Sequence, residues 1–279
     1  MFKSAGLIAR YDNAHALKLA EELSEYLKTK KIEIYAEDTL KGKANLQAKF
    51  IPLKNMKPDF LITIGGDGTI LRTCLEVPKP EPPILAINMG VRGFLTEVEP
   101  KEACAAVETC LHGDFNIEKC FKLAISFGEG TIPDCLNDVV VSAGEPSKLL
   151  YTQIVKDEEP ILKCQSDGLI LATQTGSTGY SLSAGGPVLD LGVDAFILTP
   201  ICSLTVFRSL VFPAESKVTI KAIRPKDMQV LVDGRYKHHL KSENATLTVT
   251  RSKNFTSFIR FKDDFYGRLR NRLLFKGMG

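Results

Sequence analysis

The sequence lacks several features that would assign it to a specialised class of protein. No segment of its 279 residues approaches the roughly 18 consecutive apolar residues that a membrane-spanning helix needs. Positive charge does not dominate, because 36 Lys and Arg stand against 33 Asp and Glu and leave a formal charge of +3. Nucleic-acid-binding proteins usually carry a clear basic excess. We therefore expect neither a membrane nor a nucleic acid as a partner.

Cysteine motifs and targeting signals are also lacking. The seven cysteines lie scattered among apolar neighbours and form no C-x-x-C pair, so the spacing of a structural zinc site is absent. We expect them to be reduced and mostly buried. The apolar stretch at the start is too short for a signal peptide, and no cleavage pattern follows it, which predicts a cytoplasmic protein. The 44% hydrophobic and 25% charged residues are typical of an ordinary globular fold.

The patterns that are present predict two domains of different types. Over residues 1–114, short apolar runs at 5–9, 32–36, 60–64 and 84–87 alternate with helical stretches. This order is typical of β-α-β units and predicts an α/β domain with a mainly parallel sheet. We expect one helix to be capped at Asp12 or Asn13 and another to run from Pro100 to Gly113. Such sheets bind ligands at the carboxyl ends of their strands.

The pattern of apolar and polar residues changes over residues 115–255. Short apolar runs are separated there by Gly, Pro, Asp and Asn, which predicts a second, β-rich domain. The last segment, 265–275, mixes basic and apolar residues and is expected to form a helix, with residues 256–279 returning to the first domain. We interpret the arginines of this helix as a solvated face rather than a nucleic-acid patch.

The strongest motif is the turn Gly65-Gly66-Asp67-Gly68-Thr69, which directly follows the apolar run 60–64. Glycines at a strand-to-helix turn let backbone N–H groups approach phosphate oxygens, and the helix N-terminus adds partial positive charge. Asp67 is unexpected there, because phosphates repel a carboxylate. Its position makes sense if it carries out chemistry or helps to hold Mg²⁺. A plain tight turn is the weaker interpretation, since such turns seldom need three glycines.

A second cluster, 166–187, begins as an apolar strand and becomes a loop rich in hydroxyl groups and glycine. Hydroxyls such as those of Thr175 and Thr178 donate hydrogen bonds to sugar and phosphate oxygens, and Tyr180 offers a face on which a base can stack. Taken alone, a Ser/Thr/Gly run is more often a surface loop. Asp167, just before the strand, receives no clear role from the residues alone.

Taken together, these motifs resemble the NAD kinase family, which phosphorylates the adenosine ribose of NAD to make NADP. Three separated features appear in the family's order and approximate spacing: the turn 65–69, the pair Asn137-Asp138, and residues 167–168 followed by 175–180. Segments 88–95, 199–202 and 232–234 are also similar, so the resemblance covers most of the chain. Lipid kinases and phosphofructokinases share the glycine turn, so the specificity comes from the combination.

The resemblance implies a substrate cleft between the two domains and a role for each motif. Asp67 would be the general base for the ribose 2′-hydroxyl. Asn137 and Asp138 would bind the adenosine part, and Asp167 would meet the nicotinamide half. The donor phosphates would be held by Gly65, Gly66, Gly68 and Thr69. The implied NAD-binding set is Asp67, Gly68, Phe94, Asn137, Asp138, Asp167, Thr175, Thr178, Gly179 and Tyr180, with Phe94 and Tyr180 packed against the adenosine.

The implied reaction is in-line phosphoryl transfer from ATP or polyphosphate to NAD. Mg²⁺ would bridge the donor phosphates, because the chain has no lysine-bearing P-loop and no other dense cationic clamp. No protein ligand for the metal is assigned. Members of the family are usually homodimers or homotetramers, which predicts a homo-oligomer here.

The chain departs from the family pattern at several positions. Asp138 stands where Glu is commonest, Gln174 replaces a usual proline and Gly179 a usual alanine, so we expect a looser loop. Residues 203–208 lack the Pro-His of many members. Two alternatives stay open: a lipid or sugar kinase built on the same turn, and a non-catalytic sensor of NAD or NADP. The hydroxyl-rich loop favours a polar dinucleotide over the first alternative.

Overall fold

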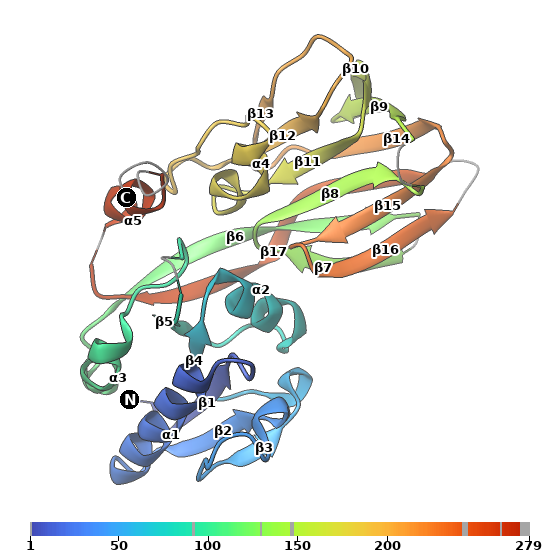
Figure 1. Cartoon of the computed structure of the whole chain (residues 1–279). Helices are drawn as coiled ribbons and strands as arrows, with labels where there is room; N and C mark the ends of the chain where they lie inside the picture. Colours follow the sequence, from blue (N-terminus) through green and yellow to red (C-terminus); the bar gives the residue numbers. More distant parts are fainter. Residues whose placement is uncertain are drawn as a thin grey trace. The chain divides into compact units, whose positions relative to one another are not determined.

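The computed structural model describes residues 2–90, 93–128, 130–145, 148–241, 245–262 and 264–273 (Figure 1). The chain divides into two compact units, one formed by Met1–Lys119 and Thr256–Gly279 and the other by Cys120–Phe255. The first boundary lies at Lys119 rather than at residue 114, because strand β6 (Asn116–Phe127) runs across it. Strand β17 (Thr246–Arg260) likewise begins in the second unit and ends in the first.

The first unit is built on parallel strands in the order β5-β4-β1-β2-β3. They are β1 (Ser4–Ala9), β2 (Glu33–Glu37), β3 (Lys49–Ile51), β4 (Phe60–Gly65) and β5 (Ile84–Asn88). The four predicted strands are confirmed to within one residue at each end. The short strand β3 has too few residues to show an apolar pattern, so sequence-based prediction does not find it.

Three helices of this unit begin and end at recognisable residues. They are α1 (Ala14–Thr29), α2 (Asp67–Glu76) and α3 (Ala103–His112). The side chain of Asn13 caps α1 by accepting the N–H of Ala16 at 3.0 Å. Gly113 ends α3 with a left-handed φ of 88°. The stretch that opens at Pro100 starts as a 3₁₀ turn, Pro100–Glu102, before α3 begins.

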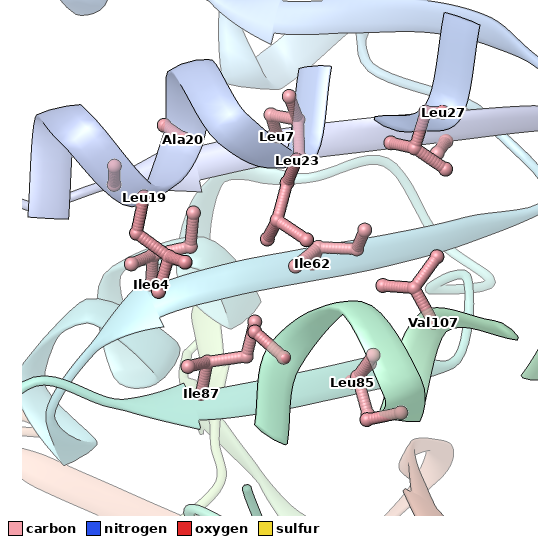
Figure 2. Packing of buried hydrophobic residues seen from close by; sticks show 14 of the residues in the cluster. Leu7, Leu19, Ala20, Leu23, Leu27, Ile62, Ile64, Leu85, Ile87 and Val107 are labelled. Carbon is pink, nitrogen blue, oxygen red and sulfur yellow. The ribbon is translucent and has the colours of Figure 1, made fainter. Parts of the chain in front are cut away.

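The core of the first unit lies between the sheet and helices α1 and α3 (Figure 2). Leu19, Leu23 and Leu27 recur on one face of α1 and pack against alternate residues of the central strands, such as Ile62 and Ile64. The intervening strand positions are also buried. Burial on both faces is typical of parallel strands, and it explains their continuous apolar runs.

The second unit consists of antiparallel strands, in agreement with the predicted β-rich domain. One sheet has the order β13-β12-β11-β8-β15-β16; the other strands of the unit follow the order β10-β9-β14-β17, with β6 pairing with β17 and β7. The short helix α4 (Tyr180–Ser183) follows β11. The remaining strands are β7 (Gly130–Cys135), β8 (Asp138–Ala143), β9 (Leu150–Lys156), β10 (Glu159–Ser166), β11 (Gly168–Ala172), β12 (Ala195–Ile201), β13 (Leu210–Pro213), β14 (Val218–Arg224), β15 (Asp227–Val232) and β16 (Tyr236–Lys241).

The C-terminal segment belongs to the first unit and ends in helix α5 (Phe265–Leu273). The prediction of a solvated arginine face is wrong for Arg268, whose side chain is only 11% exposed and donates to Glu118 at 2.9 Å. Arg270 is exposed, as predicted. The last residues of the predicted helix, 274 and 275, lie outside the described part of the chain. Among the described residues, no helix is long and apolar enough to cross a membrane.

Candidate active site

The glycine turn lies between strand β4 and helix α2, as the sequence predicts. Gly66 is the N-cap residue, and its carbonyl accepts the N–H of Thr69 at 2.9 Å. Asp67 is the first residue of the helix and is partly exposed. A carboxylate in the first turn is favourable because it faces the positive end of the helix dipole. The turn also lies at the carboxyl edge of the parallel strands, where ligands of such sheets bind.

The carboxylate of Asp67 is held in place by the backbone of a neighbouring loop. The N–H of Phe94 donates to its Oδ2 at 3.0 Å, and the N–H of Leu95 donates to its Oδ1 at 3.0 Å. These two bonds fix the orientation of the carboxylate, and the side chain stays partly exposed. Asp67 is therefore an oriented, partly exposed acceptor at the end of the sheet.

Gly93 allows this loop to come close to Asp67. A Cβ at Gly93 would collide with Oδ1 of Asp67 and would lie 2.9 Å from Oγ1 of Thr96. On its other side the loop is anchored by Arg260, whose Nη1 donates to the carbonyl oxygen of Leu95 at 3.0 Å. Gly93 and Arg260 are absent from the predicted site, although Gly93 lies in one of the segments that resemble the family. The two preceding residues, 91 and 92, lie outside the described chain.

The absence of a side chain has a different effect at each glycine of the turn. A Cβ at Gly65 would lie 2.8 Å from the Cβ of Thr69, so glycine here allows the helix to pack on the strand end. A Cβ at Gly66 would meet nothing within 4 Å, which leaves this backbone open to an approaching ligand. Gly68 is half-buried in the first turn of α2, and the side chain of Thr69 is largely buried. Their predicted contacts with phosphate stay predictions.

The ring of Phe94 does not offer an exposed face to a ligand. Its side chain is 3% exposed, and its ring packs edge-on against Phe265 of helix α5 with the centroids 5.5 Å apart. The predicted packing of Phe94 against the adenosine therefore stays a prediction, and it needs a movement of Phe265 or Phe94 itself.

In the second unit, the predicted pair Asn137-Asp138 lies where strand β7 has ended and strand β8 begins. The carboxylate of Asp233 accepts three successive backbone N–H groups there: that of Leu136 at 2.9 Å, that of Asn137 at 2.8 Å and that of Asp138 at 3.1 Å. Asp233 is 4% exposed and has a φ of 49° in the turn after β15. No role is predicted for Asp233, although its segment 232–234 resembles the family.

Thr173 holds the same segment by donating hydrogen bonds to the carbonyl oxygens of Leu136 and Asn137. Its hydroxyl donates to the carbonyl oxygen of Leu136 at 2.6 Å, and its N–H donates to that of Asn137 at 2.8 Å. The hydroxyl also accepts the N–H of Gly176 at 3.1 Å. Thr173 therefore connects the Asn137 segment to the hydroxyl-rich loop that follows β11.

Gly176 brings this loop against the backbone of Asn137. A Cβ at Gly176 would overlap the carbonyl group of Asn137 and would lie 2.9 Å from its Cα. Because the obstacle is backbone rather than a flexible side chain, the loop and the Asn137 segment could not both keep their places. A Cβ at Gly179 would meet only milder contacts, the nearest being the carbonyl oxygen of Gly176 at 3.2 Å.

We expect Gly176→Ala to lower the free energy of unfolding by about 1–3 kcal/mol, since overpacking against backbone forces a shift. Gly66→Ala is the control, because a Cβ at Gly66 would meet nothing within 4 Å. The backbone of Gly66 is extended, with φ −109° and ψ −172°, so alanine there should change stability by less than about 1 kcal/mol. Urea denaturation followed by circular dichroism measures both. Equal stability of the two variants would contradict the assigned close contact.

The remaining predicted residues of the loop differ in how far their side chains are exposed. Thr175 is 3% exposed, and the hydroxyl of Thr178 donates to the carbonyl oxygen of Thr175 at 3.1 Å. The Oγ1 of Thr175 and the Oδ1 of Asn137 are both buried without a hydrogen-bond partner among the described residues. Unsatisfied buried oxygens are costly and often mark a functional site. Tyr180 is 47% exposed, as a stacking platform requires.

Asp167 lies at the other end of the second-unit site. It is exposed and precedes β11, whereas Asp138 pairs with Ala172 at the end of that strand. Five residues of strand separate these positions by about 16 Å at roughly 3.3 Å per residue. A separation of this size suits an extended dinucleotide with its two halves at opposite ends of the strand.

The expected looseness of the loop is offset by the side chain that replaces the usual proline. Nε2 of Gln174 donates to the carbonyl oxygens of Leu191 and Val193 at 3.1 and 2.6 Å. The segment 203–208, which differs from the family pattern, is also tied down. The N–H of Gln165 donates to Oγ1 of Thr205 at 3.0 Å, and the N–H of Leu204 donates to the carbonyl oxygen of Gln165 at 2.9 Å.

Burial gives Asp138 unusual acid–base behaviour. Its carboxyl group is 7% exposed, and desolvation together with the negative charge of Asp233 raises its pKa from 3.8 to about 7. Burial also raises the pKa of Asp233 to about 6, against the lowering effect of its three backbone hydrogen bonds and of Lys122. Both carboxyl groups therefore keep their protons to a higher pH than an exposed aspartate does.

We expect the stability of the protein to fall as the pH rises from about 4 to 7. In this window the native Asp138 keeps a proton that the unfolded chain releases, so the slope of the unfolding free energy is negative; above pH 7 both states are ionised and the loss is complete. Asp138→Asn removes this charge and should be more stable than wild type at pH 8 by about 1–3 kcal/mol. Urea denaturation at pH 5 and 8 measures the difference.

The same comparison with Asp167→Asn, which changes an exposed carboxylate, serves as the control. It should show no comparable gain at pH 8. If Asp138→Asn and wild type keep the same stability difference at both pH values, the assigned proton on Asp138 is wrong.

The first unit also contains a cavity of about 690 Å³ near the carboxyl ends of β1 and β5. The residues that line it are Asn13, His15, Asn88, Met89, Gly90, Glu99 and Pro100. Within the described ranges, no group of three or more His, Cys, Asp and Glu side chains could hold a metal ion.

The predicted site residues thus form two groups, each described within its own unit. The first unit brings together Gly65, Gly66, Asp67, Gly68, Thr69 and Phe94. The second unit gathers Asn137, Asp138, Thr175, Thr178, Gly179 and Tyr180 beside one another, with Asp167 further along β11.

Comparison with family models and with curated proteins gives one consistent result. The model described as the ATP-NAD kinase N-terminal domain matches residues 5–115, and that of the ATP-NAD kinase C-terminal domain matches residues 136–261. An NAD kinase from Methanothermobacter thermautotrophicus is 37% identical over 276 residues, which are 98% of this chain and 97% of that protein. An NAD kinase from Pyrococcus abyssi is 38% identical over 272 residues, with 96% and 98% covered.

Two solved structures are similar over nearly the whole chain. Yeast NADH kinase in complex with NADH has a TM-score of 0.89 at 24% identity, over 100% of this chain and 89% of that one, and it supports the fold alone. An NAD kinase from Archaeoglobus fulgidus in complex with ATP has a TM-score of 0.79 at 26% identity, over 96% and 99%.

Proposed function

Because this chain belongs to the NAD kinase family, and is therefore a phosphotransferase that acts on a hydroxyl group, we propose that Asp67 is the general base of its reaction. The reaction transfers a phosphoryl group from ATP or polyphosphate to the 2′-hydroxyl of the adenosine ribose of NAD and forms NADP. The observation that carries the proposal is the anchored carboxylate of Asp67 at the carboxyl edge of the sheet, with both oxygens oriented by backbone N–H groups.

The chemistry asked of Asp67 is modest and well defined. A sugar hydroxyl is a poor nucleophile, and a carboxylate within hydrogen-bond reach takes its proton as the new phosphorus–oxygen bond forms. Help of this kind is typically worth about 10²–10⁴ in rate. The fixed orientation matters, because phosphoryl transfer is catalysed mainly by positioning and by neutralising charge on the transferred group.

The donor phosphates are proposed to lie on the glycine turn. The open backbone at Gly66 and the N-terminus of α2 offer N–H groups and partial positive charge to phosphate oxygens. Mg²⁺ enters as part of the donor substrate and neutralises its phosphates. Whether the donor is ATP or polyphosphate is decided by measuring NADP formation with each of them.

The acceptor is proposed to bind through the second unit. Asn137 and Asp138 face the adenosine part, Tyr180 supplies an exposed ring for packing, and Asp167 lies far enough along β11 to meet the nicotinamide half. The orphaned oxygens of Asn137 and Thr175 support this placement, since a bound nucleotide would satisfy them after a small side-chain adjustment. A homo-oligomeric assembly and a cytoplasmic location stay predictions.

The test is NADP formation from NAD by the purified protein with Mg²⁺ and either ATP or polyphosphate, read with an NADP-specific dehydrogenase. We expect product with at least one donor. Tight nucleotide binding without product under every donor would favour the non-catalytic sensor. Phosphorylation of diacylglycerol or fructose 6-phosphate but not of NAD would favour the lipid- or sugar-kinase alternative, which the family assignment already disfavours.

A further inference from the structure

The segment Leu136–Asp138 has an unusually complete set of backbone partners for a connection between two strands. Asp233 accepts all three of its N–H groups. The backbone N–H of Asp233 also donates to the carbonyl oxygen of Asp138 at 2.9 Å, and Thr173 binds the carbonyl oxygens of Leu136 and Asn137. The segment is thus held from two sides by residues that lie far from it in sequence.

The carboxylate of Asp233 contacts the backbone of this segment and is not open to a substrate. It is 4% exposed, and both of its carboxylate oxygens accept backbone N–H groups, so it has no open face for a ligand. Hydrogen bonds from N–H groups to a carboxylate are roughly twice as strong as those between neutral groups. The pairing of Val232 with Val139, between β15 and β8, fixes the start of the turn that carries Asp233.

We propose that Asp233 is a positioning residue that sets the affinity for the acceptor nucleotide by fixing the backbone of Asn137 and Asp138. The proposal rests on the proposed function, in which these two residues bind the adenosine part of NAD. Without the carboxylate, up to three buried N–H groups would lose their acceptor, and the segment would rearrange to find others. Displacements of about 1 Å at a binding residue are enough to weaken productive binding strongly.

The decisive experiment compares the steady-state kinetics of Asp233→Asn and wild type. An asparagine has one acceptor oxygen in place of two, so the backbone of the segment loses at least one of its bonds. We expect the KM for NAD to rise at least tenfold, while the KM for ATP stays within twofold and kcat falls less than the KM for NAD rises. A loss of folded enzyme alone would lower the apparent kcat and leave both KM values unchanged. That outcome, or an equal rise of the KM for NAD and the KM for ATP, would overturn the proposal.

Asp227→Asn is the matched control, because it removes another carboxylate from the same β15–β16 hairpin. Oδ2 of Asp227 lies 3.2 Å from Nε2 of His239, and Asp227 pairs with Lys241 at the end of the hairpin opposite to Asp233. Its kinetics should match those of wild type. Asn137→Ala supplies the reference for a direct contact and should also raise the KM for NAD.

The outcomes separate the two proposals. If Asn137→Ala raises the KM for NAD but Asp233→Asn leaves it within twofold of wild type, the positioning role is wrong and the acceptor site stands. If an active enzyme keeps its KM for NAD in Asn137→Ala, the assigned acceptor site is wrong and the positioning role falls with it. If wild type forms no NADP, the proposed function itself fails.

A measurement on wild type covers the case in which Asp233→Asn does not fold. The amide protons of residues 136, 137 and 138 should all move downfield in an NMR pH titration as the neighbouring carboxyl groups of Asp233 and Asp138 ionise. The other titratable groups that face Asp233 are Asp138, Lys122 and Cys135, and only the carboxyl groups change charge in the acidic range. Amide protons that stay unshifted at these three positions through this range would overturn the proposal.

Discussion

Replacing Asp67 by asparagine should lower kcat at least 100-fold and leave the protein folded. An amide cannot take the proton of the ribose hydroxyl, and general-base help is typically worth about 10²–10⁴ in rate. The amide oxygen of asparagine can still accept one of the two N–H groups of Phe94 and Leu95, so the loop keeps part of its anchor. Initial rates of NADP formation measure the loss, and circular dichroism checks the fold.

Asp59 provides a matched control for this substitution. Its carboxylate also accepts two backbone N–H groups, those of Lys3 and Ser4, but it precedes strand β4 instead of following it. Asp59→Asn should therefore lose a similar anchor without loss of turnover. A kcat for Asp67→Asn within tenfold of wild type would remove Asp67 from the mechanism, and an equal loss in Asp59→Asn would reduce its role to structure.

Replacing Arg260 by alanine should lower the free energy of unfolding by about 3–5 kcal/mol. The side chain of Arg260 is 4% exposed and donates to Glu118 at 2.8 Å and to Glu97 at 3.2 Å. Removing one partner of a buried ion pair leaves the other charge uncompensated, which is the costly case. We place the effect near the lower end, because Arg268 still pairs with Glu118 at 2.9 Å. Urea denaturation followed by circular dichroism gives the value.

Arg251 is the control for Arg260, because it lies on the same strand β17 and also has two acidic partners. Those partners, Asp194 and Glu215, are 69% and 79% exposed. Exposed pairs contribute about 0–1 kcal/mol, so Arg251→Ala should have a small effect. Equal losses for the two alanine variants would show that burial does not decide the strength of the Arg260 network.

Features that depend on neighbouring residues could be predicted from the sequence. The strand, the glycine turn and the helix around Asp67 follow one another directly, so their order alone indicates where the carboxylate lies. The same holds for Asn13 at the start of α1 and Gly113 at the end of α3, because capping depends on a few adjacent residues. The resemblance to a family added Asn137 and Asp138, which no local pattern would mark.

Features that depend on distant residues could not be predicted in this way. Asp233 lies 95 residues from Asp138 in sequence, and Arg260 lies 142 residues from Glu118. Nothing near either residue reveals its partners, so Asp233 receives no role. Arg268, which binds the same Glu118, is misinterpreted as solvated for the same reason. The predicted boundary at residue 114 falls where the sequence pattern changes, whereas the compact units divide at Lys119, inside strand β6, which no local pattern marks.

The discontinuous first unit has a consequence for the order in which the protein is made. This unit needs both ends of the chain, whereas the second unit is one continuous segment, Cys120–Phe255. Because domains generally fold as units during synthesis, the second unit is complete before the last residues leave the ribosome. Arg260, which holds the carbonyl oxygen of Leu95 beside Asp67, arrives only then. The loop that orients Asp67, the proposed general base, is therefore finished last, so an incompletely synthesised chain contains Asp67 without the anchor that Arg260 gives to this loop.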